Sequence, residues 1–432
     1  MIWNPEYETM GRDALQQLQL RRLQMTVSWV YERVGYYRDR LDELGVRPRD
    51  IRSRDDVRRL PFTDKTALRD TYPYGMFALP LEEVVRVHSS SGTTGKPIVV
   101  GYSRGDINTW TELTARVAAA AGVHRGDLVQ MAFLYGMFTG GWGMHYGIER
   151  LGATIIPAGA GQTERHLMMM HDFGTTVLVS TPSYALYLAE QGEAEGIDFS
   201  ALPLRLGLFG GEPCSDAMKR EIEEKLHIKA TDNYGLSEVM GPGVAGECEC
   251  GCGLHLAEDH LLLEIIDPET EEPLPYGQQG ELVITTLTKE AFPVLRYRTH
   301  DLTTLDVSPC ECGRTLARME KVRARTDDML IIRGVNVFPS QVEDVLFKIE
   351  GVRPHYHIVV DRKKNLDDIE VRLEVEEAVF SDIMADMVAF QRTVADKLQS
   401  ILGLRARVTL VEPGAIERSA GKSKRVLDMR EF

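Results

Sequence analysis

Apolar residues recur at helical spacing in the first part of the chain. The segment LQQLQLRRLQMTVSWVYERV places leucine, methionine and valine three and four residues apart, with arginine and glutamine between them. This spacing is typical of amphipathic helices. Prolines at 48 and 61 interrupt the pattern, so it predicts several helices up to about Tyr72 rather than one long helix.

From Val84 onward, short apolar runs alternate with helical segments. ATIIP, TTVLVST and LRLGLFG have the length and composition of buried strands, and a candidate helix follows each of them. This alternation predicts an α/β architecture with largely parallel sheets. Further on, HLLLEIIDP, GELVITTL and LTTLDV alternate or run apolar between turns, which is typical of β-hairpins.

The pattern changes again near Arg325. DMLIIRG, HYHIVVDR, DIEVRLEVEE and ARVTLVEP are predicted strands, and PSQVEDVLFKI and DIMADMVAFQRTVADKLQSIL are predicted helices. They predict a compact α+β unit of roughly 105 residues. A chain of 432 residues exceeds what one core usually organises. We therefore expect a large domain over residues 1–326, with a helical segment over 1–75, and a small mobile domain over 327–432.

Composition and charge narrow the choice of partners. The chain is 43% hydrophobic and 27% charged, as ordinary globular proteins are. Its 50 basic and 65 acidic residues give a net charge of −15, which argues against a nucleic acid or an anionic membrane as partner. No stretch approaches the length of a membrane helix, and MIWNPEYETM lacks the features of a signal peptide. We therefore expect a cytoplasmic protein.

The stretch SSSGTTGKP, Ser89 to Pro97, lies between two apolar runs. Glycines let the backbone direct N–H groups at an anion, and hydroxyls add further donors. The spacing differs from the Walker pattern, because Gly92 and Gly95 bracket only two residues and Pro97 follows Lys96. The stretch therefore predicts a strand–loop–strand phosphate site, with a polar surface hairpin as the alternative.

Five further stretches carry candidate chemistry in a fixed order. GLFGGEP ends a predicted strand in glycines that let a flat ring approach the backbone, and DNYGLSE combines an amide, an aromatic ring and a carboxylate. RYRTHD places a carboxylate after basic residues. RTDDMLIIRG falls at the predicted domain junction, and ERSAGKSKR places a lysine in a glycine-containing setting near the end of the chain.

With these stretches in order, the sequence resembles the adenylate-forming acyl-CoA ligases, most closely their phenylacetate-CoA ligase branch. YGMFTGGWGMHYGIERLG, YGLSEVMGPGVA, LTKEAFPVLRYRTHDL and DDMLIIRGVNVFPSQVE are similar to that branch over nearly the whole chain. The resemblance implies an α/β adenylation domain with a β-rich subdomain and a mobile α+β C-terminal domain. It also implies an ATP-dependent, AMP-forming enzyme that makes an acyl-adenylate and then a CoA thioester.

The resemblance gives each stretch a role in binding ATP. Glu238 would bind Mg²⁺, whose charge offsets the charge developing on the α-phosphate. Tyr234 would stack on adenine, Asn233 would bond its amine, Asp301 would accept both ribose hydroxyls, and Arg325 would support the ribose. The hydroxyl-rich loop would bind the β- and γ-phosphates through Ser90, Ser91, Thr93, Thr94 and Lys96. The other expected nucleotide contacts are Gly211, Glu212, Pro213, Asp232 and Gly235.

Two lysines have alternative interpretations. Lys422 matches the family's AGK pattern, which implies a lysine that bridges the α-phosphate and the acyl oxygen in the transition state. By composition alone it reads as a solvated lysine, and the neighbouring Lys424 is the nearest alternative. Lys65, in LPFTDK, also matches a basic position of the branch and would reach phosphate, unless it belongs to a surface helix cap.

Two half-reactions at one site imply that the small domain rotates between them. Asp327 would be the hinge, although Asp327 and Asp328 also suit a turn cap. After rotation Lys422 would leave and the loop at Gly334 would face the pantetheine arm of CoA. Ala324 stands where the family commonly has a glycine, which bears on the detail of this loop.

The cysteines gather in two short stretches, CECGCGLH and CEC. Two sets of soft ligands about 55 residues apart suit a tetrahedral Zn²⁺ that ties one hairpin to another. From the zinc-bearing members of the branch we expect a structural site made of Cys248, His255, Cys310 and Cys312. Cys250 and Cys252 are substitute ligands, and free thiols in a turn-rich loop are the alternative.

The acyl group would be surrounded by Tyr135, Phe138, Gly141, Trp142 and Pro213. The branch commonly has a smaller side chain at Trp142, so the indole would shorten or flatten the cavity. A flat aromatic slot favours an aromatic or arylacetic monocarboxylic acid. A short hydroxylated aliphatic acid is the alternative substrate, and Phe138 alternatively belongs to the core.

Two other functions are compatible with the fold. One is an adenylylating ligase that does not use CoA, and the other is an ATP-sensing or scaffold protein. The second predicts loss of Glu238 or of the C-terminal lysine, and both are present. The expected ligands are therefore a carboxylic acid, ATP, Mg²⁺ and CoA, with structural Zn²⁺. The family further implies a homodimer.

Overall fold

The computed structural model describes residues 1–90, 97–322, 324–326, 330–332, 335–363, 366–379, 384–418 and 425–429. The chain divides into two compact units. The first unit comprises Met1–Ser180, Ser200–Gly211 and Ile228–Lys321. The second comprises Thr181–Phe199, Glu212–His227 and Val322–Phe432.

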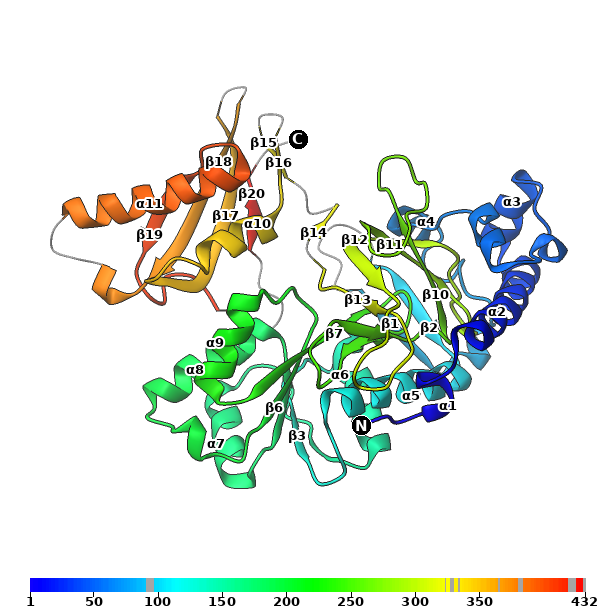
Figure 1. The fold of residues 1–432 in the computed structure, drawn as a ribbon, viewed down its shortest axis with the longest axis horizontal. Coiled ribbons are helices and arrows are strands. Elements are labelled where there is room, and N and C mark those ends of the chain that lie inside the picture. Colours follow the sequence, from blue (N-terminus) through cyan, green and yellow to red (C-terminus); the bar gives the residue numbers. More distant parts are fainter. Residues whose placement is uncertain are drawn as a thin grey trace. The chain divides into compact units, whose positions relative to one another are not determined.

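The first unit begins with helices, as the apolar spacing predicts. The longest of them buries Leu15, Leu23, Val27 and Val30 along one face, which is the stripe that a core-facing helix needs. The prediction of several helices before Tyr72 is confirmed. They are α1 (Pro5–Glu8), α2 (Arg12–Arg33), α3 (Gly35–Glu43), η1 (Pro48–Asp50), η2 (Arg54–Arg59) and α4 (Lys65–Asp70), drawn in blue shades in Figure 1.

Two short strands flank the hydroxyl-rich stretch. β1 (Arg86–Ser89) pairs antiparallel with β2 (Val99–Tyr102), so that Arg86 lies opposite Tyr102 and Ser89 lies opposite Val99. The predicted strand–loop–strand arrangement is confirmed for the strands. Residues 91–96 of the loop lie outside the described residues.

One half of the large sheet is parallel. Its strands run in the order β7, β6, β5, β3, β4, and every neighbouring pair among them is parallel. This confirms the α/β prediction from ATIIP, TTVLVST and LRLGLFG. The elements are η3 (Leu81–Glu83), α5 (Arg104–Ala121), β3 (Leu128–Met131), α6 (Thr139–Leu151), β4 (Thr154–Ile156), α7 (Thr163–Phe173), β5 (Val177–Ser180), η4 (Phe199–Ala201), β6 (Leu206–Phe209) and β7 (Lys229–Leu236).

The other half of the sheet is antiparallel. It continues from β7 through β8, β9, β13, β12 and β11 to β10, and all of these pairs are antiparallel. The predicted hairpins are therefore confirmed. The strands are β8 (Gly241–Glu247), β9 (Leu254–Leu256), β10 (Leu261–Ile266), β11 (Gln279–Thr286), β12 (Tyr297–Asp306) and β13 (Arg318–Met319).

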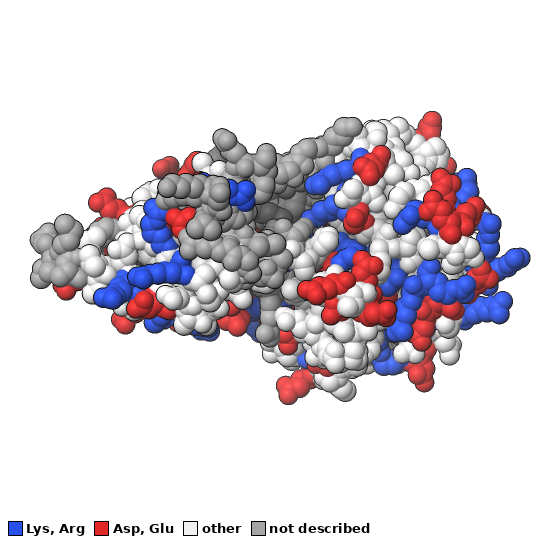
Figure 2. Space-filling view, turned by 90° about the horizontal axis from the view of Figure 1, so that it is seen from above, with Lys and Arg blue, Asp and Glu red and all other residues white. Residues whose placement is uncertain are grey.

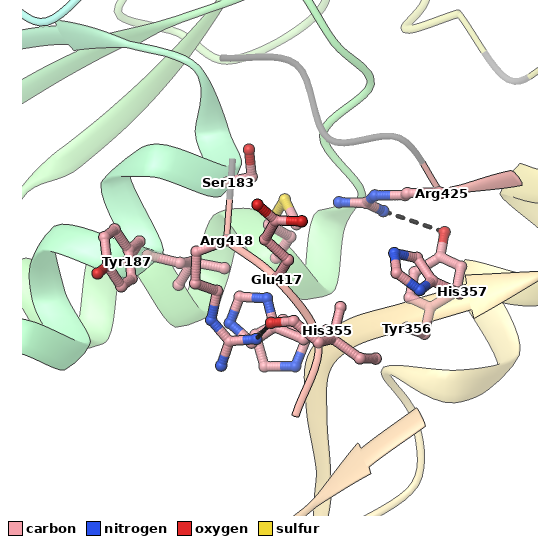
Figure 3. A pocket seen from close by; sticks show the side chains of 12 residues that line it. Ser183, Tyr187, His355, Tyr356, His357, Glu417, Arg418 and Arg425 are labelled. Atoms are coloured by element: carbon pink, nitrogen blue, oxygen red, sulfur yellow. Dashed lines mark hydrogen bonds between the residues drawn. The ribbon is translucent and has the colours of Figure 1, made fainter. Parts of the chain in front are cut away.

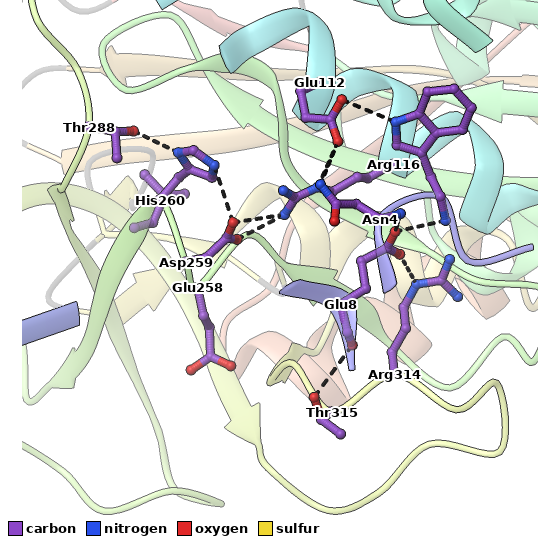
Figure 4. A network of polar contacts seen from close by, with 12 residues as sticks. Asn4, Glu8, Glu112, Arg116, Glu258, Asp259, His260, Thr288, Arg314 and Thr315 are labelled. Carbon is purple, nitrogen blue, oxygen red and sulfur yellow. Dashed lines mark hydrogen bonds and ion pairs between the residues drawn. The ribbon is translucent and has the colours of Figure 1, made fainter. Parts of the chain in front are cut away.

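A buried polar network fastens residues 1–9 to the body of the first unit (Figure 4). Glu8 is 1% exposed and accepts hydrogen bonds from the backbone N–H groups of Trp3 and Asn4 and from Arg314 Nε, at 2.8, 2.6 and 2.6 Å. Nearby, Arg116 Nη1 donates to both oxygens of Asp259 at 2.9 and 3.0 Å. These pairs satisfy charges that burial would otherwise make costly.

The second unit contains a four-stranded sheet in the order β19-β18-β17-β20, with α10 and α11 packed in the same core (Figure 1). The predicted helices of this region are confirmed, as are the predicted strands over the described residues, and β14, β16 and β20 are additions. The elements are α8 (Pro182–Ala194), α9 (Asp216–Leu226), β14 (Ala324–Arg325), β15 (Leu330–Ile332), β16 (Val335–Val337), α10 (Pro339–Leu346), β17 (Val352–Lys363), β18 (Leu366–Val375), η5 (Glu377–Val379), α11 (Met384–Leu402), β19 (Arg407–Val411) and β20 (Val426–Asp428).

Charged side chains of both signs are interspersed on the face drawn in Figure 2, rather than separated by sign. Among the helices of the described residues, none combines the length and the apolar character that crossing a bilayer requires.

Candidate active site

The predicted adenine-binding segments meet where β6 and β7 end. Asn233, on β7, donates from Nδ2 to the carbonyl oxygen of Phe209, the last residue of β6, at 2.7 Å. This bond orients the amide and leaves Oδ1 as the acceptor that an exocyclic amine would use. Gly210 and Gly211 follow Phe209 directly, and Asn233 therefore lies beside the glycine segment as predicted.

The hairpin from β7 to β8 requires glycine at position 235. A Cβ atom there would lie 1.9 Å from the carbonyl oxygen of Gly241, which no side chain can tolerate. Sequence reasoning interpreted Gly235 as a nucleotide contact. The structure gives it a packing role as well, because its close approach fixes the turn that carries Glu238.

Tyr234 and Asp301 lie in direct contact. The Tyr234 hydroxyl donates to Asp301 Oδ2 at 2.5 Å, and Asp301 is 2% exposed on β12. The prediction had Asp301 accept both ribose hydroxyls, whereas here one of its oxygens binds the phenol. His300, just before Asp301, has a φ of 63°, in the left-handed region that residues other than glycine adopt uncommonly.

The remaining predicted nucleotide residues lie on different elements. Asp232 forms a 3.0 Å ion pair with Lys321, and its N–H donates to Glu247 Oε2 at 3.0 Å. In the second unit, Glu212 Oε1 accepts from Ser183 N at 2.8 Å, Pro213 follows Glu212, and Arg325 lies on β14.

Glu238 lies in the turn between β7 and β8 and is 6% exposed. Two side-chain contacts anchor this turn: Thr139 Oγ1 lies 3.1 Å from Ser237 Oγ, and Trp110 Nε1 donates to the Pro242 carbonyl at 2.7 Å. The carboxylate predicted to bind Mg²⁺ is thus nearly buried on a firmly held turn.

Ser90 closes the base of the hydroxyl-rich loop. Its N–H donates to the Ile98 carbonyl at 2.9 Å, and its hydroxyl accepts from Ile98 N at 3.1 Å. Lys65 is the first residue of α4, after Asp64, which caps the helix by accepting from Ala67 N at 2.8 Å. Seven predicted site residues lie outside the described residues: Ser91, Thr93, Thr94, Lys96, Asp327, Gly334 and Lys422.

The predicted acyl segment is an aromatic cluster around Trp142, on α6. Trp142 packs edge-to-face on Tyr135 with 5.2 Å between ring centres, and it stacks on Tyr146 at 5.9 Å. The Tyr135 hydroxyl lies 2.9 Å from His145 Nδ1. Burial raises the pKa of Tyr135, so this phenol stays protonated at neutral pH.

Phe138 and Gly141 have packing roles in the same segment. Phe138 precedes α6 and packs against the core beneath it, with its ring 6.3 Å from that of Phe133, which suits the core alternative. A Cβ atom at Gly141 would lie 2.8 Å from the Leu134 carbonyl oxygen. Sequence reasoning missed Tyr146 and His145, although Tyr146 lies four residues after Trp142 and therefore on the same helix face.

A pocket in the second unit is lined by described residues that precede and follow residues 419–424 in the sequence (Figure 3). Glu417 and Arg418, before that segment, and Arg425, after it, line the pocket together with Ser183 and Tyr187 of α8. Arg425 Nη1 donates to the Tyr356 hydroxyl at 3.1 Å. Described residues on both sides of residues 419–424 therefore line one pocket, a feature that sequence reasoning missed.

The four predicted zinc ligands converge. The ligand atoms of Cys248, His255, Cys310 and Cys312 all lie within 4.8 Å of one another. They come from the end of β8, from β9 and from the loop between β12 and β13. Cys248 Sγ lies 3.8 Å from Cys310 Sγ, and Cys312 Sγ lies 3.4 Å from His255 Nε2.

The surroundings shift the free ligands of the cluster differently. Burial acts to raise the pKa of Cys312, but hydrogen bonds from Arg314 outweigh it, and the pKa lies below its ordinary value. Burial raises the pKa of Cys248 to about 11 and lowers the pKa of His255 to about 4. His255 Nδ1 faces the Leu316 carbonyl oxygen at 3.4 Å. Of the two substitutes, Cys252 is near the cluster, with its Sγ 3.2 Å from Cys310 Sγ, and Cys250 is exposed.

Comparisons with known proteins place this arrangement in a family. Residues 57–288 match the family model described as AMP-binding enzyme, and residues 334–430 match the AMP-binding enzyme C-terminal domain. Phenylacetate-coenzyme A ligase of Thermus thermophilus is 49% identical over 445 residues, covering 100% of both chains. The Escherichia coli enzyme of the same name is 48% identical, covering 98% of this chain and 97% of its own.

Solved structures agree with the sequence comparisons. 2-Hydroxyisobutyryl-CoA ligase in the postadenylation state with 2-HIB-AMP has a TM-score of 0.93 and is 31% identical, covering 99% of this chain and 92% of that chain. The same ligase with 2-HIB-AMP and CoA has a TM-score of 0.73 at 32% identity, covering 100% and 93%. The chain therefore belongs to the phenylacetate-CoA ligase branch of the adenylate-forming enzymes and is an AMP-forming acid-CoA ligase.

Proposed function

We propose that the acid activated by this ligase is phenylacetate or a closely similar arylacetic acid. The observation that carries the proposal is the aromatic cluster of Tyr135, Trp142 and Tyr146, whose rings pack within 6 Å of their neighbours on the acyl segment. Flat rings favour a flat apolar guest. The relatives named phenylacetate-coenzyme A ligase, which match nearly the whole chain, support the same choice.

The reaction proceeds in two displacements. An oxygen of the acid's carboxylate attacks the α-phosphorus of ATP, the bond from that phosphorus to the bridging oxygen breaks, and pyrophosphate leaves. The thiol of CoA, having lost its proton, then attacks the acyl carbon, and AMP leaves with the electrons of the acyl–oxygen bond. Both steps develop negative charge on oxygen, so positioned donors lower the barrier.

For the nucleotide, we assign adenine to Gly211, Glu212, Pro213 and Asn233, with Tyr234 on the other face of the ring. Asp301 takes the ribose, and Tyr234, which binds Asp301 at 2.5 Å, supports the carboxylate from behind. We assign binding of the phosphates to Ser90, Ser91, Thr93, Thr94, Lys96 and Lys65. The hydroxyl of Ser90 is already oriented by Ile98 N, and it can still donate its own proton to a phosphate oxygen.

For the chemistry, we assign Lys422 to the α-phosphate and the acyl oxygen during adenylation. The match of Lys422 to the family's AGK pattern supports this assignment, and Arg418 and Arg425, the described residues on either side of it, line one pocket. Glu238 would hold Mg²⁺, whose charge offsets the negative charge developing on the α-phosphate. Asp327 serves as the hinge and Gly334 faces the pantetheine arm during thioester formation.

The cysteine cluster is assigned to a structural Zn²⁺ bound by Cys248, His255, Cys310 and Cys312. A Zn–S bond of about 2.3 Å in a tetrahedral site places two sulfur atoms about 3.8 Å apart. The distance from Cys248 Sγ to Cys310 Sγ agrees with this value. The Leu316 carbonyl beside His255 Nδ1 supplies the outer contact that orients a ligating imidazole.

A substrate panel tests the proposed function. The purified protein is assayed with ATP, Mg²⁺ and CoA on phenylacetate, ring-hydroxylated phenylacetates, benzoate and 2-hydroxyisobutyrate, and both AMP and thioester are measured. We expect kcat/KM for phenylacetate to exceed that for 2-hydroxyisobutyrate at least about tenfold, because the aromatic cluster offers contacts that a short acid cannot use. A higher value for 2-hydroxyisobutyrate would select the hydroxylated aliphatic alternative. AMP release at the same rate without CoA would select a CoA-independent ligase.

We further propose that the protein acts in the cytoplasm as a homodimer. The resemblance to the family supports the dimer, and the composition supports the compartment. Light scattering coupled to size-exclusion chromatography measures the mass directly, and a mass near one chain of 48.5 kDa would contradict the dimer.

A further inference from the structure

Three rings and an ammonium group form a buried cluster in the first unit, between β1, β2 and α5. His88, Tyr102, Trp110 and Lys289 are 2%, 0%, 1% and 3% exposed. Tyr102 and Trp110 stack with 4.8 Å between ring centres, and His88 meets both rings edge-on at 5.6 and 5.7 Å. The Lys289 ammonium lies 3.8 Å from the centre of the Tyr102 ring. The imidazole of His88 is therefore buried and in contact with two rings at once.

His88 joins β1 to the acyl segment. Its Nδ1 lies 3.0 Å from the carbonyl oxygen of Met137, and the backbone N–H of Ser89 reaches the same oxygen at 3.1 Å. Met137 comes directly before Phe138 and α6. One carbonyl of the acyl segment therefore accepts from two successive residues of the strand that leads into the phosphate loop.

The chemistry of the contact fixes the tautomer of His88. A carbonyl oxygen only accepts, so Nδ1 carries the proton. Nε2 is buried and has no hydrogen-bond partner among the described residues. Burial lowers the pKa of His88 to about 4, so the ring is neutral at physiological pH. Of the two ring nitrogens, Nδ1 therefore makes the hydrogen bond to the Met137 carbonyl oxygen.

The same cluster reaches the turn that carries Glu238. Trp110 stacks on Tyr102 at one end and donates from Nε1 to the Pro242 carbonyl at 2.7 Å at the other. Pro242 lies four residues after Glu238. The cluster thus contacts the strand that leads into the phosphate loop, the acyl segment and the hairpin that carries Glu238. In the proposed function, these three parts bind ATP phosphates, the acid and Mg²⁺, respectively.

We propose that His88 is a positioning residue for adenylation: its Nδ1–H sets the acyl segment at a fixed distance from β1, the strand that leads into the phosphate loop, without touching substrate. The inference rests on the proposed assignments of these two segments. The reason is geometric. The attacking carboxylate oxygen must lie about 3–3.5 Å from the phosphorus, and a misplacement of about 1 Å can cost about a hundredfold in rate. Thioester formation starts from an acyl-adenylate that is already joined, so it depends less on this spacing.

Three substitutions separate the two nitrogens. In His88→Asn the amide nitrogen stands as many bonds from Cα as Nδ1 does, so the bond to Met137 is kept. His88→Gln places its amide where Nε2 was, and His88→Leu removes both nitrogens. His171→Leu, at a histidine whose side chain is 70% exposed on α7, is the matched control. Thermal unfolding of each variant reports folding separately from activity.

Adenylation is measured by exchange of pyrophosphate into ATP with phenylacetate, and thioester formation by CoA transfer from supplied phenylacetyl-adenylate. We expect adenylation to fall about 10- to 100-fold in His88→Gln and His88→Leu and to stay within about threefold of wild type in His88→Asn. CoA transfer should stay within about threefold in all three variants.

Several results would overturn the inference. Rescue by Gln but not by Asn would mean that Nε2 is the working atom. An equal loss of both half-reactions would mean that His88 has a purely structural role. Full activity of every variant would mean that His88 has no role in either half-reaction. If His88→Leu does not fold, the Asn and Gln pair still decides. Wild-type protein that is inactive on all acids of the panel would contradict the proposed function instead, so the two failures are distinguishable.

Discussion

Arg86 holds Tyr146 in place: its Nη2 donates a 2.9 Å hydrogen bond to the Tyr146 hydroxyl, and its guanidinium carbon lies 4.8 Å from the centre of that ring. The same guanidinium lies 5.4 Å from the Trp142 ring, which stacks on Tyr146. Tyr135 packs edge-to-face on the same indole, so Arg86, Tyr135 and Tyr146 all contact Trp142. These contacts favour one orientation of the indole within the acyl segment.

Trp142 is expected to limit the size of the acid. Trp142→Ala should lower kcat/KM for phenylacetate about tenfold or more, because ring contacts are lost, and raise activity on naphthylacetate relative to phenylacetate. Steady-state kinetics on both acids measure the ratio. Tyr146→Phe is the control, since it keeps the ring and loses only the bond to Arg86. An unchanged ratio in Trp142→Ala would place the indole away from the acid.

Asp301 and Tyr234 are expected to differ in their effects on ATP. Asp301→Asn should raise the KM for ATP about tenfold or more, because a charged acceptor of the ribose hydroxyls is lost. Tyr234→Phe keeps the ring for stacking and should change this KM by less than about threefold. Pyrophosphate exchange at varied ATP checks both values. Equal effects of the two variants would contradict the division of roles.

Lys422→Ala is expected to reduce adenylation about 100- to 1,000-fold while CoA transfer from supplied phenylacetyl-adenylate continues, because the contact is made in the first transition state. Lys424→Ala, two residues away in the same segment, is the matched control and should keep adenylation. Pyrophosphate exchange and thioester assays report the two steps. An equal loss of both steps in Lys422→Ala, or a larger loss in Lys424→Ala, would contradict the assignment.

Metal analysis tests the cysteine cluster. Wild-type protein should contain about one zinc per chain, and Cys310→Ser should contain little and unfold at a lower temperature. Cys250→Ser and Cys252→Ser should keep the metal, because these residues are the substitutes and not the favoured ligands. Wild-type protein with clearly less than one zinc per chain would argue for free thiols. Loss of zinc in Cys252→Ser would show that Cys252 is a ligand in place of one of the four favoured residues.

The pair of Asp259 and Arg116 should make stability depend on pH. Burial acts to raise the pKa of Asp259, but His260 and Arg116 outweigh it, and the pKa lies below its ordinary value. A carboxyl whose pKa is lowered on folding contributes stability above its unfolded pKa of about 3.9 and loses it as the pH falls further. Asp259→Asn should therefore lower the free energy of unfolding by about 3 kcal/mol at pH 7, through loss of a buried ion pair.

Urea unfolding between pH 7 and pH 3.5 measures this difference. We expect it to be constant above about pH 5 and to shrink at lower pH. Asp39→Asn is the control, because Asp39 is exposed on α3 and its carboxylate makes no hydrogen bond or ion pair among the described contacts. A difference that stays constant down to pH 3.5 would show that the charge of Asp259 does not matter.

Local patterns were enough to predict most elements of the fold. The β-branched run at Val177 and the helix after it needed only their own composition to be predicted. β20 was missed because VLD is three residues long and becomes a strand only by pairing with β17, some 68 residues earlier in its register from Ile358 to Val426. Short strands of this kind are determined by the partner and not by their own sequence.

Candidate site residues could be predicted where a short local motif marks them. Two short stretches supply the candidate metal ligands, the resemblance to the family selects four of them, and these four converge. Lys289 could not be chosen, since nothing in LTKEAFP indicates that its ammonium will be buried over Tyr102, which lies 187 residues earlier. His88 was missed for the same reason: its role depends on Met137, and a sequence does not display the contact between them.

The close approach of Gly235 to the Gly241 carbonyl has a practical consequence for engineering new acid specificity. A library that varies both sides of the hairpin would mostly yield chains in which the Glu238 turn is displaced, because any side chain at Gly235 collides with the opposite backbone. A library that substitutes Trp142 and Tyr146 on α6 would vary the acyl segment and leave the hairpin backbone unchanged.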